Sequence, residues 1–176
     1  MVSSILILLF LLLLLLTFII ILISFIWTTI IGGVPYLATD RKRVMHMIEL
    51  AKIKKGEKVV DLGSGDGRIV IAMAQKGAKA HGYELNLLYI VISKWNIRKH
   101  HLENIAHIHW QNFFTTDLSS FDVITCFGIP YVMDRIEKKL YKEVRPKSRI
   151  VINSFPFKKW RYTQRNDHIF LYTKSK

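Results

Sequence analysis

Two kinds of apolar pattern divide the chain. Residues 5–31 are almost entirely Leu, Ile and Phe, and the polar residues among them are Thr17, Ser24, Thr28 and Thr29. A bilayer core requires about 20 apolar helical residues, so this run predicts a retained transmembrane anchor. A cleaved signal peptide, the alternative, would have a basic start, a shorter apolar core and a small-residue cleavage site. The run also has no amphipathic stripe, which argues against a buried helix of a soluble domain.

The rest of the sequence alternates short apolar segments with segments of helical periodicity. Strands are expected at 59–62, 79–84, 105–110, 121–127, 149–154 and 168–172. Helices are expected after a cap at Thr39 or Asp40, and over 69–74, 86–101 and 134–144. This alternation predicts an α/β fold with a doubly wound, mostly parallel sheet. We therefore assign 1–34 to the anchor and its linker, and 35–176 to one domain.

Periodicity also predicts which helix positions face the sheet. In the first domain helix these are Val44, Met47, Ile48 and Ala51, and in the last they are Ile136, Leu140 and Val144. In the helix over 86–101, we expect the inward residues to be Leu87, Leu88, Val91, Trp95 and Ile97.

The charge of the chain is strongly basic. There are 26 Lys and Arg against 13 Asp and Glu, a formal net charge of +13, which favours anionic surroundings such as lipid head groups or nucleic acid. Arg41, Lys42 and Arg43 follow the apolar run and its linker, whereas no basic residue precedes the run. The positive-inside rule then places the domain on the cytoplasmic side of a membrane, or on the matrix side in a mitochondrion. Cys126 is the only cysteine, which excludes an intrachain disulfide.

A glycine-rich turn follows the first predicted strand. The stretch Asp61-Leu62-Gly63-Ser64-Gly65-Asp66-Gly67 has the spacing D-x-G-x-G-x-G, and Arg68 stands where a dinucleotide-binding G-x-G-x-x-G would need its last glycine. Glycines allow positive φ and close approach of backbone to a ligand, and the following helix offers unpaired N–H groups. Glu84 ends the next strand, 17 residues after Gly67. A glycine turn in another α/β protein, including an NAD-binding one, is the alternative interpretation.

This stretch resembles the cofactor motif of class I S-adenosylmethionine (SAM) methyltransferases. The resemblance implies that Glu84 binds the ribose hydroxyls of SAM. Ligands of such sheets bind beyond the carboxyl ends of the strands, where Asn86, Asn112 and Phe113 also lie. The Asn112 amide oxygen can accept a hydrogen bond from the adenine amine, or Asn112 serves only as a strand-end turn. The expected SAM-binding residues are Asp61, Gly63, Ser64, Gly65, Asp66, Gly67, Glu84, Asn86, Asn112 and Phe113.

Metal chemistry is not expected. His107 and His109 lie on one face of a predicted strand, but no Cys or acid completes a ligand set.

Further stretches resemble one branch of these enzymes, the small membrane-anchored protein-lysine methyltransferases of the adenine nucleotide translocase and ATP synthase c-subunit type and their prokaryotic relatives. The matching stretches are Pro35-Tyr36-Leu37-Ala38-Thr39, the glycine motif, Gly82-Tyr83-Glu84-Leu85-Asn86, Phe127-Gly128-Ile129-Pro130, Glu137-Lys138-Lys139-Leu140, and Phe155-Pro156-Phe157 with Trp160. They cover about residues 35–172. Ala38, Asn112 and Lys158-Lys159 depart from the family pattern, which affects the adenine contacts and substrate choice more than the reaction.

The resemblance implies SAM-dependent methylation of a lysine in a protein in or near the same membrane. A desolvated, aromatic-lined channel would lower the pKa of the target lysine, and the candidates for its lining are Tyr36, Thr39, Tyr131, Phe155, Phe157 and Trp160. We assign no general base. Two alternatives stay open: an RNA or DNA methyltransferase, favoured by the net charge, and a non-catalytic membrane-tethered adapter on a methyltransferase scaffold.

Overall fold

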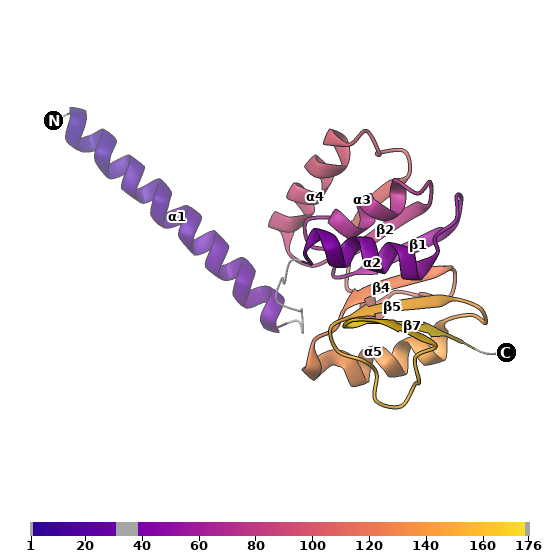
Figure 1. Ribbon diagram of the computed structural model, residues 1–176. Helices are drawn as coiled ribbons and strands as arrows, with labels where there is room; N and C mark the ends of the chain where they lie inside the picture. Colours follow the sequence, from indigo (N-terminus) through magenta and orange to yellow (C-terminus); the bar gives the residue numbers. More distant parts are fainter. Residues whose placement is uncertain (1, 31–38, 175–176) are drawn as a thin grey trace. The chain divides into compact units, whose positions relative to one another are not determined.

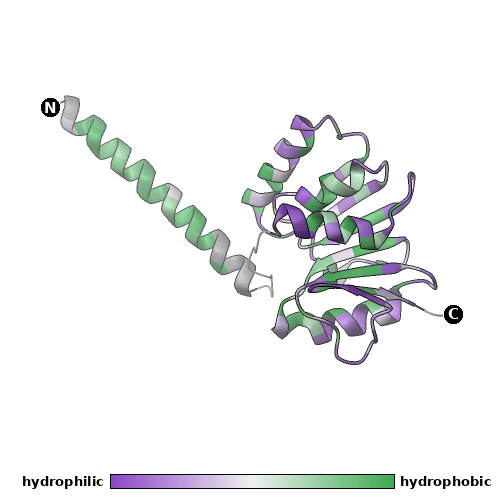
Figure 2. Ribbon diagram, in the orientation of Figure 1, coloured by the Kyte–Doolittle hydropathy of each residue, from purple (hydrophilic) through white to green (hydrophobic). Residues whose placement is uncertain are grey.

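A computed structural model describes residues 2–30 and 39–174, which fall into two compact units, 1–35 and 36–176. The first unit contains helix α1 (Val2–Ile30). Within α1, the segment Ser4–Ile23 is long and apolar enough to cross a membrane, a property that a signal sequence would share. Figure 2 shows the hydrophobic colouring of this helix.

The second unit is built on a seven-stranded sheet of order β3-β2-β1-β4-β5-β7-β6 (Figure 1). The strands are β1 (Lys58–Leu62), β2 (Lys79–Glu84), β3 (Ala106–Trp110), β4 (Val123–Phe127), β5 (Arg149–Asn153), β6 (Gln164–Asn166) and β7 (Ile169–Thr173). The first five pair in parallel, whereas β7 is antiparallel to both β5 and β6. The predicted α/β class and mostly parallel sheet are confirmed.

Four longer helices pack on this sheet: α2 (Arg41–Ala51), α3 (Arg68–Ala74), α4 (Leu87–Lys99) and α5 (Pro130–Glu143). A short 3-10 helix, η1 (Phe113–Thr115), follows β3. One core cluster joins α2, α3 and α4 to the sheet, and α5 lies on the opposite face (Figure 1). The carboxyl ends of the parallel strands therefore meet the amino ends of α3, α4 and α5 at one edge, which we call the carboxyl edge.

Helix α2 agrees with its predicted start and inner face. The Asp40 side chain caps it by accepting a hydrogen bond from the Arg43 N–H at 2.9 Å. Its buried residues are Val44, Met47, Ile48 and Ala51, as predicted. The inner face of α5 was also predicted correctly at Ile136 and Leu140. This helix begins four residues earlier than predicted because Pro130 occupies its first turn, where a missing N–H costs nothing.

The predicted inner face of α4 was wrong except at Ile97. Leu87, Leu88, Val91 and Trp95 are exposed, with 51%, 53%, 66% and 62% of their surface accessible. The helix buries Ile90, Ser93 and Ile97 instead. Ser93 sets this rotation, because a Cβ added at Gly67 would lie only 2.9 Å from the Ser93 Cβ. A small residue is required at the point where α4 passes the glycine loop.

Candidate functional site

The glycine loop connects the carboxyl end of β1 to the start of α3. Gly63, Gly65 and Gly67 all have positive φ, at 76°, 52° and 82°, which side chains with a Cβ rarely adopt. The Gly63 and Ser64 N–H groups donate to the Tyr83 carbonyl oxygen at 2.9 and 3.0 Å, which fixes the loop against β2. The motif thus forms the tight strand-to-helix turn that its spacing predicts.

Glu84 lies across from this loop at the end of β2. Its Oε2 accepts a hydrogen bond from the Gly65 N–H at 2.9 Å, and its Oε1 accepts two from the Leu85 and Asn86 N–H groups at 2.8 Å each. These bonds hold the carboxylate at the carboxyl edge beside the glycine loop. A carboxylate has about four acceptor positions, so it retains capacity for a ligand hydroxyl.

Asp61 lies beneath the loop and is 2% exposed. Its Oδ1 accepts a hydrogen bond from the Thr125 hydroxyl at 2.7 Å. Burial, with lesser contributions from the charges of Glu84 and Asp66, raises the pKa of Asp61 to about 7, although the Thr125 hydroxyl opposes the shift. The Glu84 carboxylate, together with Asp61 when it is ionised, makes this site negative, whereas the charge of Asp66 is paired with Arg68. A negative site suits a cationic ligand such as SAM.

Two further observations fit a small polar ligand at this loop. Among the described residues, the buried side-chain atoms without a hydrogen-bond partner are Ser64 Oγ, in the loop and against Gly82 of β2, and Asn153 Oδ1, at the end of β5 on the same edge. A buried polar atom is costly unless a ligand or water satisfies it. A Cβ added at Gly63 would meet no described atom within 4 Å, so the space above this glycine is open. The residues present therefore fit the SAM that the motif implies.

The remaining predicted cofactor residues act as caps here. The Asn86 side chain accepts from the Leu88 N–H at 3.0 Å and begins α4. The Asn112 side chain accepts a hydrogen bond from the Phe114 N–H at 2.9 Å and caps η1. This agrees with the interpretation of Asn112 as a strand-end turn residue. Its second oxygen lone pair remains for an adenine amine. Phe113 is buried and its ring lies tilted against that of Phe114, with ring centroids 4.4 Å apart.

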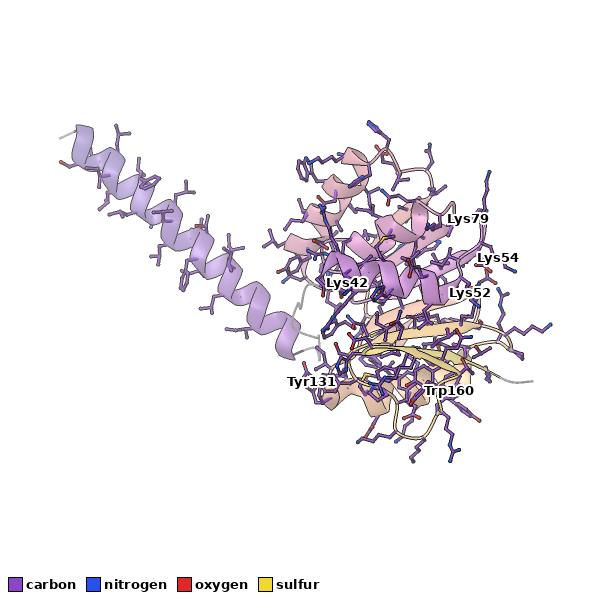
Figure 3. All side chains as sticks on the ribbon, in the orientation of Figure 1. Lys42, Lys52, Lys54, Lys79, Tyr131 and Trp160 are labelled. Atoms are coloured by element: carbon purple, nitrogen blue, oxygen red, sulfur yellow. The ribbon has the colours of Figure 1, made fainter. Side chains whose placement is uncertain are left out.

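The channel candidates separate into two groups. Tyr131 and Phe155 begin α5 and follow β5 at the carboxyl edge, and 66% and 46% of their surfaces are exposed. Phe157 and Trp160 instead pack with Tyr172, at ring-centroid distances of 4.6 and 5.7 Å. Figure 3 shows Tyr131 and Trp160 well apart. Tyr36 lies outside the described residues.

Thr39 belongs to a polar network at the same edge. It is buried. Its hydroxyl oxygen accepts a hydrogen bond from Asn153 Nδ2 at 3.4 Å, and its carbonyl oxygen accepts one from Arg68 Nη1 at 2.7 Å. Arg68 also forms an ion pair with Asp66 at 2.6 Å. The network links the first described residue of the domain to the glycine loop.

Two residues of this region had no role assigned from the sequence, although Glu137 belongs to one of the stretches that resemble the family. Asn153 is fully buried at the end of β5, beside the site. Glu137 is 6% exposed, and its carboxylate accepts hydrogen bonds from the backbone N–H groups of Lys158, Lys159 and Trp160. It thereby fixes the loop that follows β5. The signal for Glu137 was its place on the otherwise apolar inner face of α5.

The histidines of β2 and β3 form a pair away from the glycine loop. His81 Nδ1 lies 3.0 Å from His109 Nε2, and burial lowers the pKa of His81 to about 4. Among residues 2–30 and 39–174, no group of three or more His, Cys, Asp or Glu side chains is placed to hold a metal ion.

Comparison with known proteins identifies the family to which the chain belongs. Residues 61–164 match the family model described as the ANTKMT methyltransferase domain. The protein-lysine N-methyltransferase of Saccharolobus islandicus is 39% identical, over 72% of this chain and 80% of that protein. The human lysine N-methyltransferase of the ATP synthase c-subunit is 32% identical over 72% of this chain, and the mouse adenine nucleotide translocase lysine N-methyltransferase is 32% identical over 72%. The chain spans about half the length of these two relatives, 54% and 56%.

Solved structures agree on the fold. An RNA methyltransferase from Salinibacter ruber in complex with S-adenosylhomocysteine superposes with a TM-score of 0.76 at 26% identity, covering 79% of this chain and 94% of that one. A SAM-dependent methyltransferase from Thiobacillus denitrificans, also in complex with S-adenosylhomocysteine, has a TM-score of 0.58 at 18% identity, covering 64% of this chain and 48% of that one. The cofactor of these methyltransferases is SAM, as the motif implied. The chain therefore belongs to the ANTKMT methyltransferase domain family.

Proposed function

We propose that this chain is a membrane-anchored, SAM-dependent protein-lysine N-methyltransferase. The observation that carries the proposal is the pairing of the glycine loop with Glu84 at the carboxyl edge, 2.9 Å apart between Gly65 N and Glu84 Oε2. Relatives named as protein-lysine N-methyltransferases support the acceptor class. On this proposal the loop residues 61–67 and Glu84 hold SAM.

The chain's own residues contribute mainly positioning to this reaction. SAM supplies a methyl group on a positively charged sulfonium. The nitrogen lone pair of a neutral lysine attacks that methyl carbon, the carbon–sulfur bond breaks, and the product ammonium releases a proton to solvent. We assign Tyr131 and Phe155 to the rim of the acceptor channel, because both are exposed aromatics at the carboxyl edge. Aromatic walls favour the neutral amine over the ammonium by desolvation.

We further propose that α1 crosses a membrane and that the domain lies on its cytoplasmic or matrix side. The apolar segment Ser4–Ile23 and the basic residues Arg41, Lys42 and Arg43 support this orientation. The substrate is then a protein in or near the same membrane. Relatives named for the ATP synthase c-subunit and for the adenine nucleotide translocase support that substrate class.

The test is methyl transfer from radiolabelled SAM by the full chain to membrane and soluble fractions of its own organism, each with and without RNase. Label in a membrane-protein band that is absent with Glu84→Ala supports the proposal. Label at lysine is then identified by amino-acid analysis of that band.

RNA methylation is the second candidate. The Salinibacter ruber RNA methyltransferase structure and the net charge of +13 favour it. RNase-sensitive label would establish this candidate and refute protein methylation. SAM binding without any label would favour the non-catalytic adapter.

A further inference from the structure

The outward face of α4 is unusually apolar for a helix of a soluble domain. Leu87, Val91 and Trp95 follow one another at intervals of four residues, and Leu88 lies beside them, so the four occupy about 100° of the helix surface. Each is more than half exposed. Contiguous exposed apolar surface of this kind marks a contact with another apolar phase.

Trp110 extends the same surface from the edge of the sheet. It is 63% exposed, and its Nε1 donates to the Leu85 carbonyl oxygen at 3.1 Å, just before α4 begins. Ala106 and Ile108 of β3 face the α3–α4 core cluster, so Trp110, two residues further on, lies on that side too. We call these five residues, Leu87, Leu88, Val91, Trp95 and Trp110, the α4 surface.

Basic residues border the α4 surface. Lys94, Arg98 and Lys99 are exposed on α4, and Lys99 Nζ lies 5.4 Å from the Trp95 ring centroid. Residues 87–101 contain no Asp or Glu. Two tryptophans, aliphatic side chains and flanking cations are the composition of helices that lie in the interface of an anionic bilayer. A surface for a second protein would not require this one-sided charge.

The α4 surface begins at the same edge of the sheet as the first described residue of the domain. Leu87 follows directly on Asn86, the cap of α4, and lies three residues after Glu84 at the carboxyl edge. Thr39, the first described residue of the domain, is held at that edge by Arg68 and Asn153. An anchor preceding Thr39 would therefore tether the domain by the edge from which α4 begins.

We propose that the α4 surface inserts into the headgroup layer of a bilayer containing anionic lipids. Val91 and Trp95 lie below the phosphates, and Arg98 and Lys99 lie level with them. This contact rests on the proposed function, because it uses the bilayer that α1 crosses. It gives the tethered domain one fixed orientation, with the flank that carries α4 and Trp110 on the bilayer and the carboxyl edge opening next to it, so the enzyme selects acceptor lysines close to the bilayer surface.

The test uses the full chain in nanodiscs, with one reporter cysteine at a time. Cys126 is 2% exposed and does not compete for labelling. Val91→Cys carries an environment-sensitive fluorophore on the α4 surface. Lys142→Cys carries it on the last turn of α5, exposed and at the opposite edge of the sheet. Discs contain phosphatidylcholine alone or with one third phosphatidylserine, and each has a version with spin-labelled lipid as quencher.

We expect the fluorophore at position 91 to emit at shorter wavelength than the fluorophore at position 142, and spin-labelled lipid to quench it several-fold more. Both effects should be strongest in discs that contain phosphatidylserine and weakest in high salt. Equal quenching at the two positions would overturn the inference. A wavelength shift at Val91 without lipid quenching would also overturn it, because protein, either a second copy or a substrate, would then cover the surface.

Two controls separate this inference from the proposed function. A chain that fails to enter the discs refutes the anchor and the α4 contact together. A chain that enters the discs and binds SAM, but shows no lipid quenching at Val91, refutes the α4 contact alone. The double substitution Val91→Ser and Trp95→Ser should abolish the phosphatidylserine dependence of methyl transfer to disc-embedded protein while leaving the SAM dissociation constant unchanged. An unaltered lipid dependence in that variant contradicts the inference.

Discussion

Glu84→Ala tests the cofactor site most directly. The wild-type carboxylate is held by three backbone N–H groups at 2.8–2.9 Å, from Gly65, Leu85 and Asn86. Alanine removes the ribose acceptor and also releases the Gly65 N–H that the carboxylate fixes within the glycine loop. Two consequences are therefore expected, a weaker cofactor complex and a less ordered loop.

The magnitude follows from hydrogen bonds to a charged group. Loss of such bonds to the ribose hydroxyls costs roughly 1–3 kcal/mol. This corresponds to a SAM dissociation constant roughly 5- to 150-fold higher. Glu84 is only half-buried, so water can replace the carboxylate at the three N–H groups, and the domain should still fold.

Titration calorimetry of SAM binding to the full chain in detergent measures this effect, with the melting temperature as a check on folding. Glu103→Ala is the matched control, because Glu103 is an exposed acid between α4 and β3, at the far edge of the sheet. An unchanged SAM affinity in Glu84→Ala would refute the assigned pocket. An equal loss in Glu103→Ala would show that net charge, rather than Glu84, determines affinity.

Three further changes test the site and the loops around it. Because burial raises the pKa of Asp61 to about 7, this carboxyl ionises between pH 6 and pH 8, and binding of cationic SAM should strengthen by up to about tenfold over that range. In calorimetry, Asp61→Asn should bind SAM weakly and show no such pH dependence. Gly67→Ala combines positive φ with overlap on Ser93, so its melting temperature should fall by roughly 4–8 °C, and an unchanged value would refute the close packing. Glu137→Ala leaves three loop N–H groups without their carboxylate, so proteolysis at residues 158–160 should accelerate at unchanged SAM affinity, whereas unchanged proteolysis would contradict the loop-fixing role.

Local sequence was sufficient for much of the cofactor site. The positions of Gly63, Gly65 and Gly67 are constrained by backbone conformation alone, since each needs positive φ. Glu84 could be paired with them because parallel strands end at one edge. The same reasoning gave the inner face of α2, where Val44, Met47, Ile48 and Ala51 recur at the i, i+3, i+4, i+7 spacing of one helix face.

Hydrophobic periodicity did not predict the buried face of α4, and the reason is also physical. Residues 87–92 are apolar or aromatic without interruption, so the sequence does not distinguish an inner from an outer face. The contact between Ser93 and Gly67 makes the choice, and it turns Leu87, Val91 and Trp95 outward. Such a contact joins segments that are separate along the chain and is invisible in a window of one helix.

The sheet class, the glycine loop, its distal acid and the apolar helix at the start could be predicted from the sequence alone, because each depends on nearby residues or on a fixed strand-end rule. Only the tertiary structure brought Thr39, Arg68 and Asn153 together, across 114 residues of chain. It also packed Phe157 and Trp160 in an aromatic cluster with Tyr172, and Trp160 lies well apart from Tyr131 (Figure 3). Side-chain neighbours across such separations are chosen by packing of the whole domain, which a single sequence does not display.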